Sequence, residues 1–111
     1  MRKLFASVFF AASLLASPLV LADEVQTFTI TLKDHKFDPA TLKVPANQPF
    51  KLIVQNLDPT PEEFESKDLN REKIVAGGGK ITMPFKPLKP GTYGYYGEFN
   101  ASTAQGTIVA E

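Results

Sequence analysis

Apolar and polar residues alternate with a period of two along most of the chain after residue 25, a pattern typical of half-buried strands. The alternation predicts strands over residues 26–32, 42–44, 50–56, 80–85, 92–96 and 106–110. Prolines and a Gly77–Gly79 run interrupt the pattern and predict turns. The charged stretch 62–74 is expected to hold at most one helical turn, around residues 67–73. Short strands with such turns, and no long helical period, predict an all-β sandwich or barrel.

The first 22 residues follow a different pattern. Two basic residues precede an apolar run that ends at Ala22, just before an acidic pair. A basic start, a short apolar centre and a small final residue are typical of a secretory signal peptide. An uncleaved membrane anchor is the alternative, because a span needs about 20 apolar residues, but Pro18 and Ala22 favour cleavage. We therefore predict a cleaved signal peptide over 1–22 and one exported, periplasmic domain over 23–111.

Composition narrows the chemistry that is open to this domain. The chain has 111 residues, enough for one small domain, and its 12 Lys and Arg balance 12 Asp and Glu, which argues against a nucleic-acid binder. It has no Cys, which excludes disulfides, thiolate nucleophiles, Cys-bound zinc, iron–sulfur clusters and Cys-ligated copper. Its single histidine, His35, excludes any site built on several imidazoles. Metal or acid–base chemistry therefore depends on carboxylates and tyrosines.

Three spaced motifs then make the fold more specific. They are Phe37-x-Pro39-x-x-Leu42-x-Val44-Pro45-Ala46-Asn47, Pro87-Leu88-x-Pro90-Gly91-Thr92-Tyr93 and Gly106-Thr107-Ile108-Val109. In this order they cover nearly all of residues 23–111, and the chain resembles the cupredoxin family. The resemblance implies a Greek-key β-sandwich, here with one short helical turn. It also implies a mononuclear copper site at one end, between the loops that follow the 50–56 and 92–96 strands.

The ligand pattern of the family is missing from this chain. Glu62 stands where the resemblance places the first His ligand, and Gly97, Asn100 and Gln105 stand in the places of Cys, His and Met. Blue copper depends on a copper–thiolate bond, so we expect no type 1 copper centre. An electron carrier of the usual family kind becomes a remote alternative.

Acidic residues occupy the two loops that the resemblance assigns to the ligands. We expect one imidazole and four carboxylates to converge there as a metal site, with Tyr95 or Tyr96 nearby: His35, Glu62, Glu63, Glu65 and Glu98. Oxygen ligands with one imidazole suit iron, manganese and copper(II), and suit copper(I) poorly. Each residue also has a plainer interpretation, because a glutamate-rich run is usually a solvated turn and a lone histidine is often a surface or hydrogen-bonding residue.

A narrower resemblance suggests a biological context. The segments Asp34-His35-x-Phe37-x-Pro39, 60–66 and Gly97-Glu98-Phe99-Asn100 are similar to the small periplasmic EfeO-type and Ftr-type cupredoxin-like proteins of bacterial iron uptake. This implies a protein that binds an iron or copper ion beside an iron permease and a P19-like periplasmic iron-binding protein. Whether it assists Fe(II) oxidation stays open, because the sequence has no independent catalytic motif. The alternative is a degenerate cupredoxin that binds no metal and docks a partner protein through an acidic surface.

Overall fold

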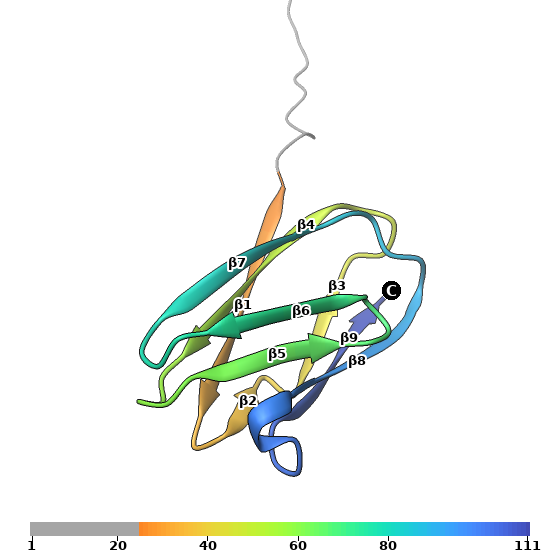
Figure 1. The fold of residues 1–111 in the computed structure, drawn as a ribbon. Coiled ribbons are helices and arrows are strands. Elements are labelled where there is room, and N and C mark those ends of the chain that lie inside the picture. Colours follow the sequence, from red (N-terminus) through yellow and green to blue (C-terminus); the bar gives the residue numbers. More distant parts are fainter. Residues whose placement is uncertain (1–24) are drawn as a thin grey trace, which may run out of the picture.

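The computed structural model describes residues 25–111, and these residues form two β-sheets packed face to face (Figure 1). The strands are β1 (Gln26–Lys33), β2 (Lys36–Asp38), β3 (Thr41–Val44), β4 (Phe50–Asn56), β5 (Glu62–Ser66), β6 (Arg71–Val75), β7 (Lys80–Phe85), β8 (Gly91–Gly97) and β9 (Gln105–Ala110). One sheet has the order β2-β1-β4-β7 and the other β3-β9-β8-β5-β6. The predicted all-β sandwich is confirmed.

The connections between strands repeatedly cross from one sheet to the other. The chain changes sheets between β2 and β3, β3 and β4, β4 and β5, β6 and β7, and β7 and β8. Two pairs are parallel, β1 with β4 and β3 with β9, and the remaining pairs are antiparallel. As a result, the β1–β2 turn and the short 3-10 helix η2 (Glu98–Asn100), far apart in sequence, lie at the same end of the sandwich (Figure 1).

Alternating apolar residues of the two sheets form the core between them. Phe50, Leu52 and Val54 of β4 are buried, as the period of two predicted. Phe64 of β5 is fully buried and its ring stacks on that of Tyr95, with ring centroids 5.0 Å apart. Met83 is 4 % exposed within this core, which agrees with a packing role for its side chain.

One element of the prediction is wrong. The stretch 67–73 holds no helical turn: residues 67–70 form a tight turn and β6 follows, so that β5 and β6 form an antiparallel hairpin. Asn70 closes the turn with a φ of 56°, a conformation that asparagine tolerates better than most residues. The one short helical turn of residues 25–111 lies instead at η2. The physical reason is pairing, because backbone hydrogen bonds between β6 and β5, which is itself paired with β8, outweigh the weak strand propensity of the charged residues.

The predicted signal peptide, residues 1–22, lies outside the described residues. Within the described part, the chain forms no helix long and apolar enough to cross a membrane.

Candidate functional site

Glu62 begins β5 and is almost completely buried, with 2 % of the residue exposed. Its Oε1 accepts hydrogen bonds from the backbone N–H of Phe99 at 2.7 Å and of Glu63 at 3.0 Å. Its Oε2 accepts a hydrogen bond from Nδ2 of Asn100 at 2.7 Å. Both carboxylate oxygens therefore have N–H partners from the chain itself, so the buried carboxylate is satisfied without an ion.

The other residues at the lost ligand positions complete this arrangement. A Cβ atom on Gly97 would lie 2.6 Å from Cδ of Glu62 and 2.8 Å from Cβ of Ala104, so the carboxylate fills the space beside Gly97. Gln105 donates from Nε2 to the carbonyl of Ala101 at 2.9 Å and closes its own loop. The end of the sandwich at which the resemblance places copper is thus closed by hydrogen bonds and packing.

A separate group of carboxylates lies on the outer face of the β5–β6 hairpin. Successive residues of a strand point to opposite faces, so Glu63 and Glu65 point away from the core while Glu62 and Phe64 point into it. Glu72 lies opposite Glu65 on β6. One carboxylate oxygen of each of Glu63, Glu65 and Glu72 lies within 4.8 Å of the other two. We call these three residues the acidic cluster.

Like charges in the acidic cluster perturb its titration. Partial burial, a hydrogen bond with Glu72 and the charges of Glu72, Glu65 and Glu98 raise the pKa of Glu63. Burial and the same group of carboxylates raise the pKa of Tyr96, so this phenol faces the cluster. Within residues 25–111, no Lys or Arg side chain lies within 4.0 Å of the three carboxylates. The cluster is therefore a concentration of uncompensated negative charge.

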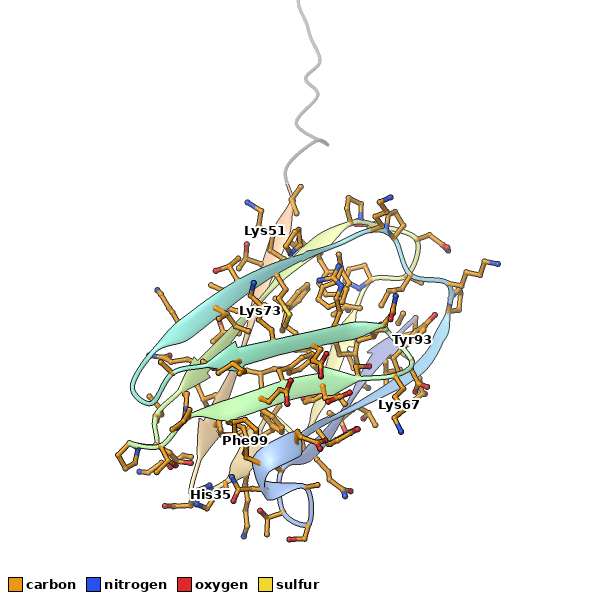
Figure 2. All side chains as sticks on the ribbon, in the orientation of Figure 1. His35, Lys51, Lys67, Lys73, Tyr93 and Phe99 are labelled. Atoms are coloured by element: carbon orange, nitrogen blue, oxygen red, sulfur yellow. The ribbon has the colours of Figure 1, made fainter. Side chains whose placement is uncertain are left out.

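His35 has a different environment. It lies in the β1–β2 turn, at the same end of the sandwich as Phe99 (Figure 2). Its Nδ1 lies 3.5 Å from Oδ2 of Asp58, and its backbone N–H donates to the same oxygen at 2.9 Å. Asp58 also accepts the backbone N–H of Asp34 at 2.7 Å. The histidine thus has a carboxylate partner of its own, which is not one of the predicted ligands.

Comparisons with known proteins agree with this architecture. The family model of the cupredoxin-like domain matches residues 4–110. This chain belongs to the cupredoxin-like domain family. A Rickettsia prowazekii (strain Madrid E) protein, described only as uncharacterized, is 48 % identical over 87 residues, covering 78 % of this chain and 70 % of that protein.

Solved structures show the same fold at low sequence identity. The blue copper protein auracyanin A from Chloroflexus aurantiacus superposes with a TM-score of 0.67 at 15 % identity, covering 79 % of this chain and all of that one. The metal-binding domain of the Cu(I)-exporting P-type ATPase CopA from Streptococcus pneumoniae D39, solved with Cu(I), gives a TM-score of 0.66 at 13 % identity. That match covers 78 % of this chain and 86 % of the domain. The chain is thus related in fold to copper-binding proteins.

A type 1 copper centre does not fit this cupredoxin-like domain. The chain has no Cys, and the thiolate is the bond on which such a centre depends. The carboxylate of Glu62 also fills the space beside Gly97 and has all its oxygens hydrogen-bonded. The buried carboxylate at this end of the fold is held by hydrogen bonds from the chain itself.

The structure brings only some of the predicted ligands together. Glu63 and Glu65 come together, and the charge of Glu98 reaches them from η2. Glu62 lies on the opposite face of the same strand, and His35 pairs with Asp58. The prediction placed the three glutamates on a loop, whereas they belong to a strand, and a strand separates neighbours by face. Glu72 was missed, because its proximity to Glu65 follows only from the hairpin register.

Proposed function

We propose that this cupredoxin-like protein binds a hard or borderline cation through the acidic cluster of Glu63, Glu65 and Glu72. The observation that supports the proposal is the approach of three carboxylate oxygens to within 4.8 Å of one another on a rigid hairpin. A donor set made only of oxygens suits Fe(III), Mn(II) or Cu(II) better than Cu(I). Copper is a natural candidate because fold relatives bind it.

The pairing of Glu65 with Glu72 is further support. These two residues lie directly opposite on antiparallel strands, where like charges destabilise a sheet. Sequences that break a local rule of this kind often do so at functional sites. A bound cation would remove the repulsion between these two carboxylates, and this relief would contribute to the free energy of binding.

The wider role that we propose follows from the narrower family resemblance. In it, the exported protein receives iron or copper in the periplasm and works beside an iron permease and a P19-like iron-binding protein. The cluster is exposed enough to receive an ion and to pass it on, since Glu63 and Glu65 are half-buried and Glu72 is exposed. Carboxylates also favour Fe(III) over Fe(II), so binding at the site would lower the reduction potential of the iron and ease the loss of its electron to a separate one-electron acceptor.

Thermal melting and calorimetry with Mn(II), Cu(II) and a weak Fe(III) chelate test the proposal. A ligand at 100 times its dissociation constant stabilises the folded state by about 2.7 kcal/mol, so melting should rise with the ion concentration. Glu72→Gln should remove most of this gain, and Glu111→Gln, an exposed glutamate beside Lys43, should leave it intact. The gain should fade in acid because protons compete for the ligands. Indifference of the wild-type protein to every ion would refute the proposal.

A metal-free docking role is the second candidate, and one observation favours it. Phe99 is 50 % exposed on η2, the same helix that carries Glu98. An apolar ring beside negative charge suits a partner with a basic surface around an apolar centre. In that case the charge substitutions would change salt-dependent association with the partner and leave the response to metals unaltered.

A further inference from the structure

The carboxylate of Glu62 connects segments that are distant in sequence. It leaves β5 on the core side and reaches the backbone of Phe99 and the side chain of Asn100, both in η2. These bonds span 37 and 38 residues. They hold the β8–β9 connection against the start of β5, which is the task that a metal ion performs when its ligands come from separate loops.

The residues around Glu62 leave space for its carboxylate. Gly97 offers no Cβ, and a Cβ there would meet the carboxylate at 2.6–2.8 Å, too close for real atoms. The backbone N–H of Gly97 donates to the carbonyl of Ala104 at 2.8 Å, so this segment cannot easily move aside. Charge-assisted hydrogen bonds to a buried carboxylate are among the stronger ones in proteins. Gly97 and Glu62 are therefore complementary in shape, because the glycine leaves the space that the carboxylate fills.

We propose that Glu62 is a hydrogen-bonded lock that has replaced the metal at the ligand end of this cupredoxin-like fold. The lock positions η2 and excludes an ion from this end. Glu62 is thus a positioning residue for the β8–β9 connection, whereas its neighbour Glu63 faces solvent on the opposite side of β5. The two adjacent glutamates have separate roles, and this inference holds whether or not the acidic cluster binds a cation.

Substitutions of the two neighbouring glutamates test the lock in the full mature protein. Glu62→Ala removes the acceptor, Glu63→Gln is the control, and Glu62→Gln is the conservative variant. Amide hydrogen exchange at Phe99 is the direct measurement, because its N–H donates to Glu62. We expect Glu62→Ala to speed this exchange at least about tenfold and to lower the melting temperature, since three donors lose their acceptor. Glu63→Gln should leave Phe99 exchange unchanged. Normal exchange and melting in Glu62→Ala would refute the lock.

Glu62→Gln keeps the test decisive if Glu62→Ala does not fold. A glutamine can still accept the two backbone N–H groups through its oxygen, and the Asn100 amide can turn to accept its NH₂. This variant should fold, with faster Phe99 exchange than the wild-type protein, because a hydrogen bond to a neutral amide oxygen is weaker than one to a carboxylate. Unchanged Phe99 exchange in Glu62→Gln would refute the lock.

Titration with Cu(II) and Mn(II) then separates a lock from a ligand. Glu62→Gln should keep the wild-type response to both ions, and a selective loss of that response would show Glu62 to be a ligand. If neither the wild-type protein nor any variant responds to an ion, the proposed function fails. The exchange of the Phe99 amide still tests whether Glu62 acts as the lock.

Discussion

Loss of the Asp58 carboxylate should disturb the β1–β2 turn, which lies at the η2 end of the sandwich. It is 7 % exposed, and its two carboxylate oxygens accept the backbone N–H groups of Asp34 and His35 at 2.7 and 2.9 Å. Both of these residues have positive φ, 53° and 58°. Left-handed backbone costs a residue with a side chain about 1–2 kcal/mol, so the turn needs these bonds to hold its shape.

The magnitude follows from the two bonds. A hydrogen bond to a charged group contributes about 1.5–3 kcal/mol, and water reaches the partly exposed turn and recovers some of it. We therefore expect Asp58→Ala to lower the free energy of unfolding by about 2 kcal/mol. In a domain of this size that corresponds to a fall of about 8–16 °C in the melting temperature. Asp58→Asn keeps one acceptor and should lose about half as much.

The pH dependence has a definite sign. The hydrogen bond from the His35 amide is the largest cause that lowers the pKa of Asp58, helped by the bond from Asp34 and the charges of His35 and Lys33, and burial opposes them. A lowered folded pKa means that the contribution is complete above the unfolded value of about 3.9 and is lost as the pH falls through the folded value. The gap between the wild-type protein and Asp58→Asn should therefore narrow in acid.

Denaturant unfolding from about pH 7 to about pH 3 measures both effects. Asp38→Asn is the control, because Asp38 is exposed on the edge strand β2 and its carboxylate has no hydrogen-bond or salt-bridge partner among the described residues. Equal stability of Asp58→Ala and the wild-type protein at neutral pH would refute the argument. So would a gap that widens as the pH falls.

Four further predictions concern the core, the copper chemistry and the leader. Tyr95→Phe should leave stability unchanged or raise it by up to about 1 kcal/mol in denaturant unfolding, because the buried hydroxyl has no hydrogen-bond partner among the described residues; a clear loss would contradict this. Gly106→Ala should lower the free energy of unfolding by about 1–3 kcal/mol, because the new Cβ would clash with the Tyr95 hydroxyl, and unchanged melting would contradict it. Added Cu(II) should give only weak visible absorption, and an intense thiolate-type band would overturn our description of the site. Mass spectrometry of the exported protein should find Asp23 as its first residue, whereas an intact membrane-held chain would show that the leader is not cleaved.

The strands of the sandwich could be predicted because their burial follows a period of two. Phe50, Leu52 and Val54 are spaced two residues apart, and the structure buries all three while Lys51 and Gln55 between and after them are exposed. No such signal exists at Arg71–Val75, whose residues are mostly charged and exposed. That strand forms because its backbone pairs with β5, and pairing between segments is a tertiary effect that a local pattern does not report.

The same effect limited the prediction of the site. The sequence places Glu62, Glu63 and Glu65 together, and only knowledge that they lie on a strand separates Glu62 from the other two. Once the hairpin is known, Glu72 follows from its pairing with Glu65. The turn has a signal of its own, because Ser66 Oγ accepts the Leu69 N–H at 3.0 Å, a serine-turn geometry that a Ser-x-x-Leu spacing allows.

The two faces of β5 show how a metal-site fold can change its chemistry without changing its framework. Gly97 has no side chain and leaves a space beside the start of β5, and the carboxylate of Glu62 fills it with hydrogen bonds that need no ion. Because a strand alternates faces, the next residue, Glu63, is then free of that structural task and points to solvent beside Glu65 and Glu72. A buried carboxylate with three N–H donors is stabilised where it lies, whereas three carboxylates on the outer face without a cationic side-chain partner repel one another. Any cation that this domain binds should therefore prefer the outer face of the hairpin to the end where the family keeps its copper.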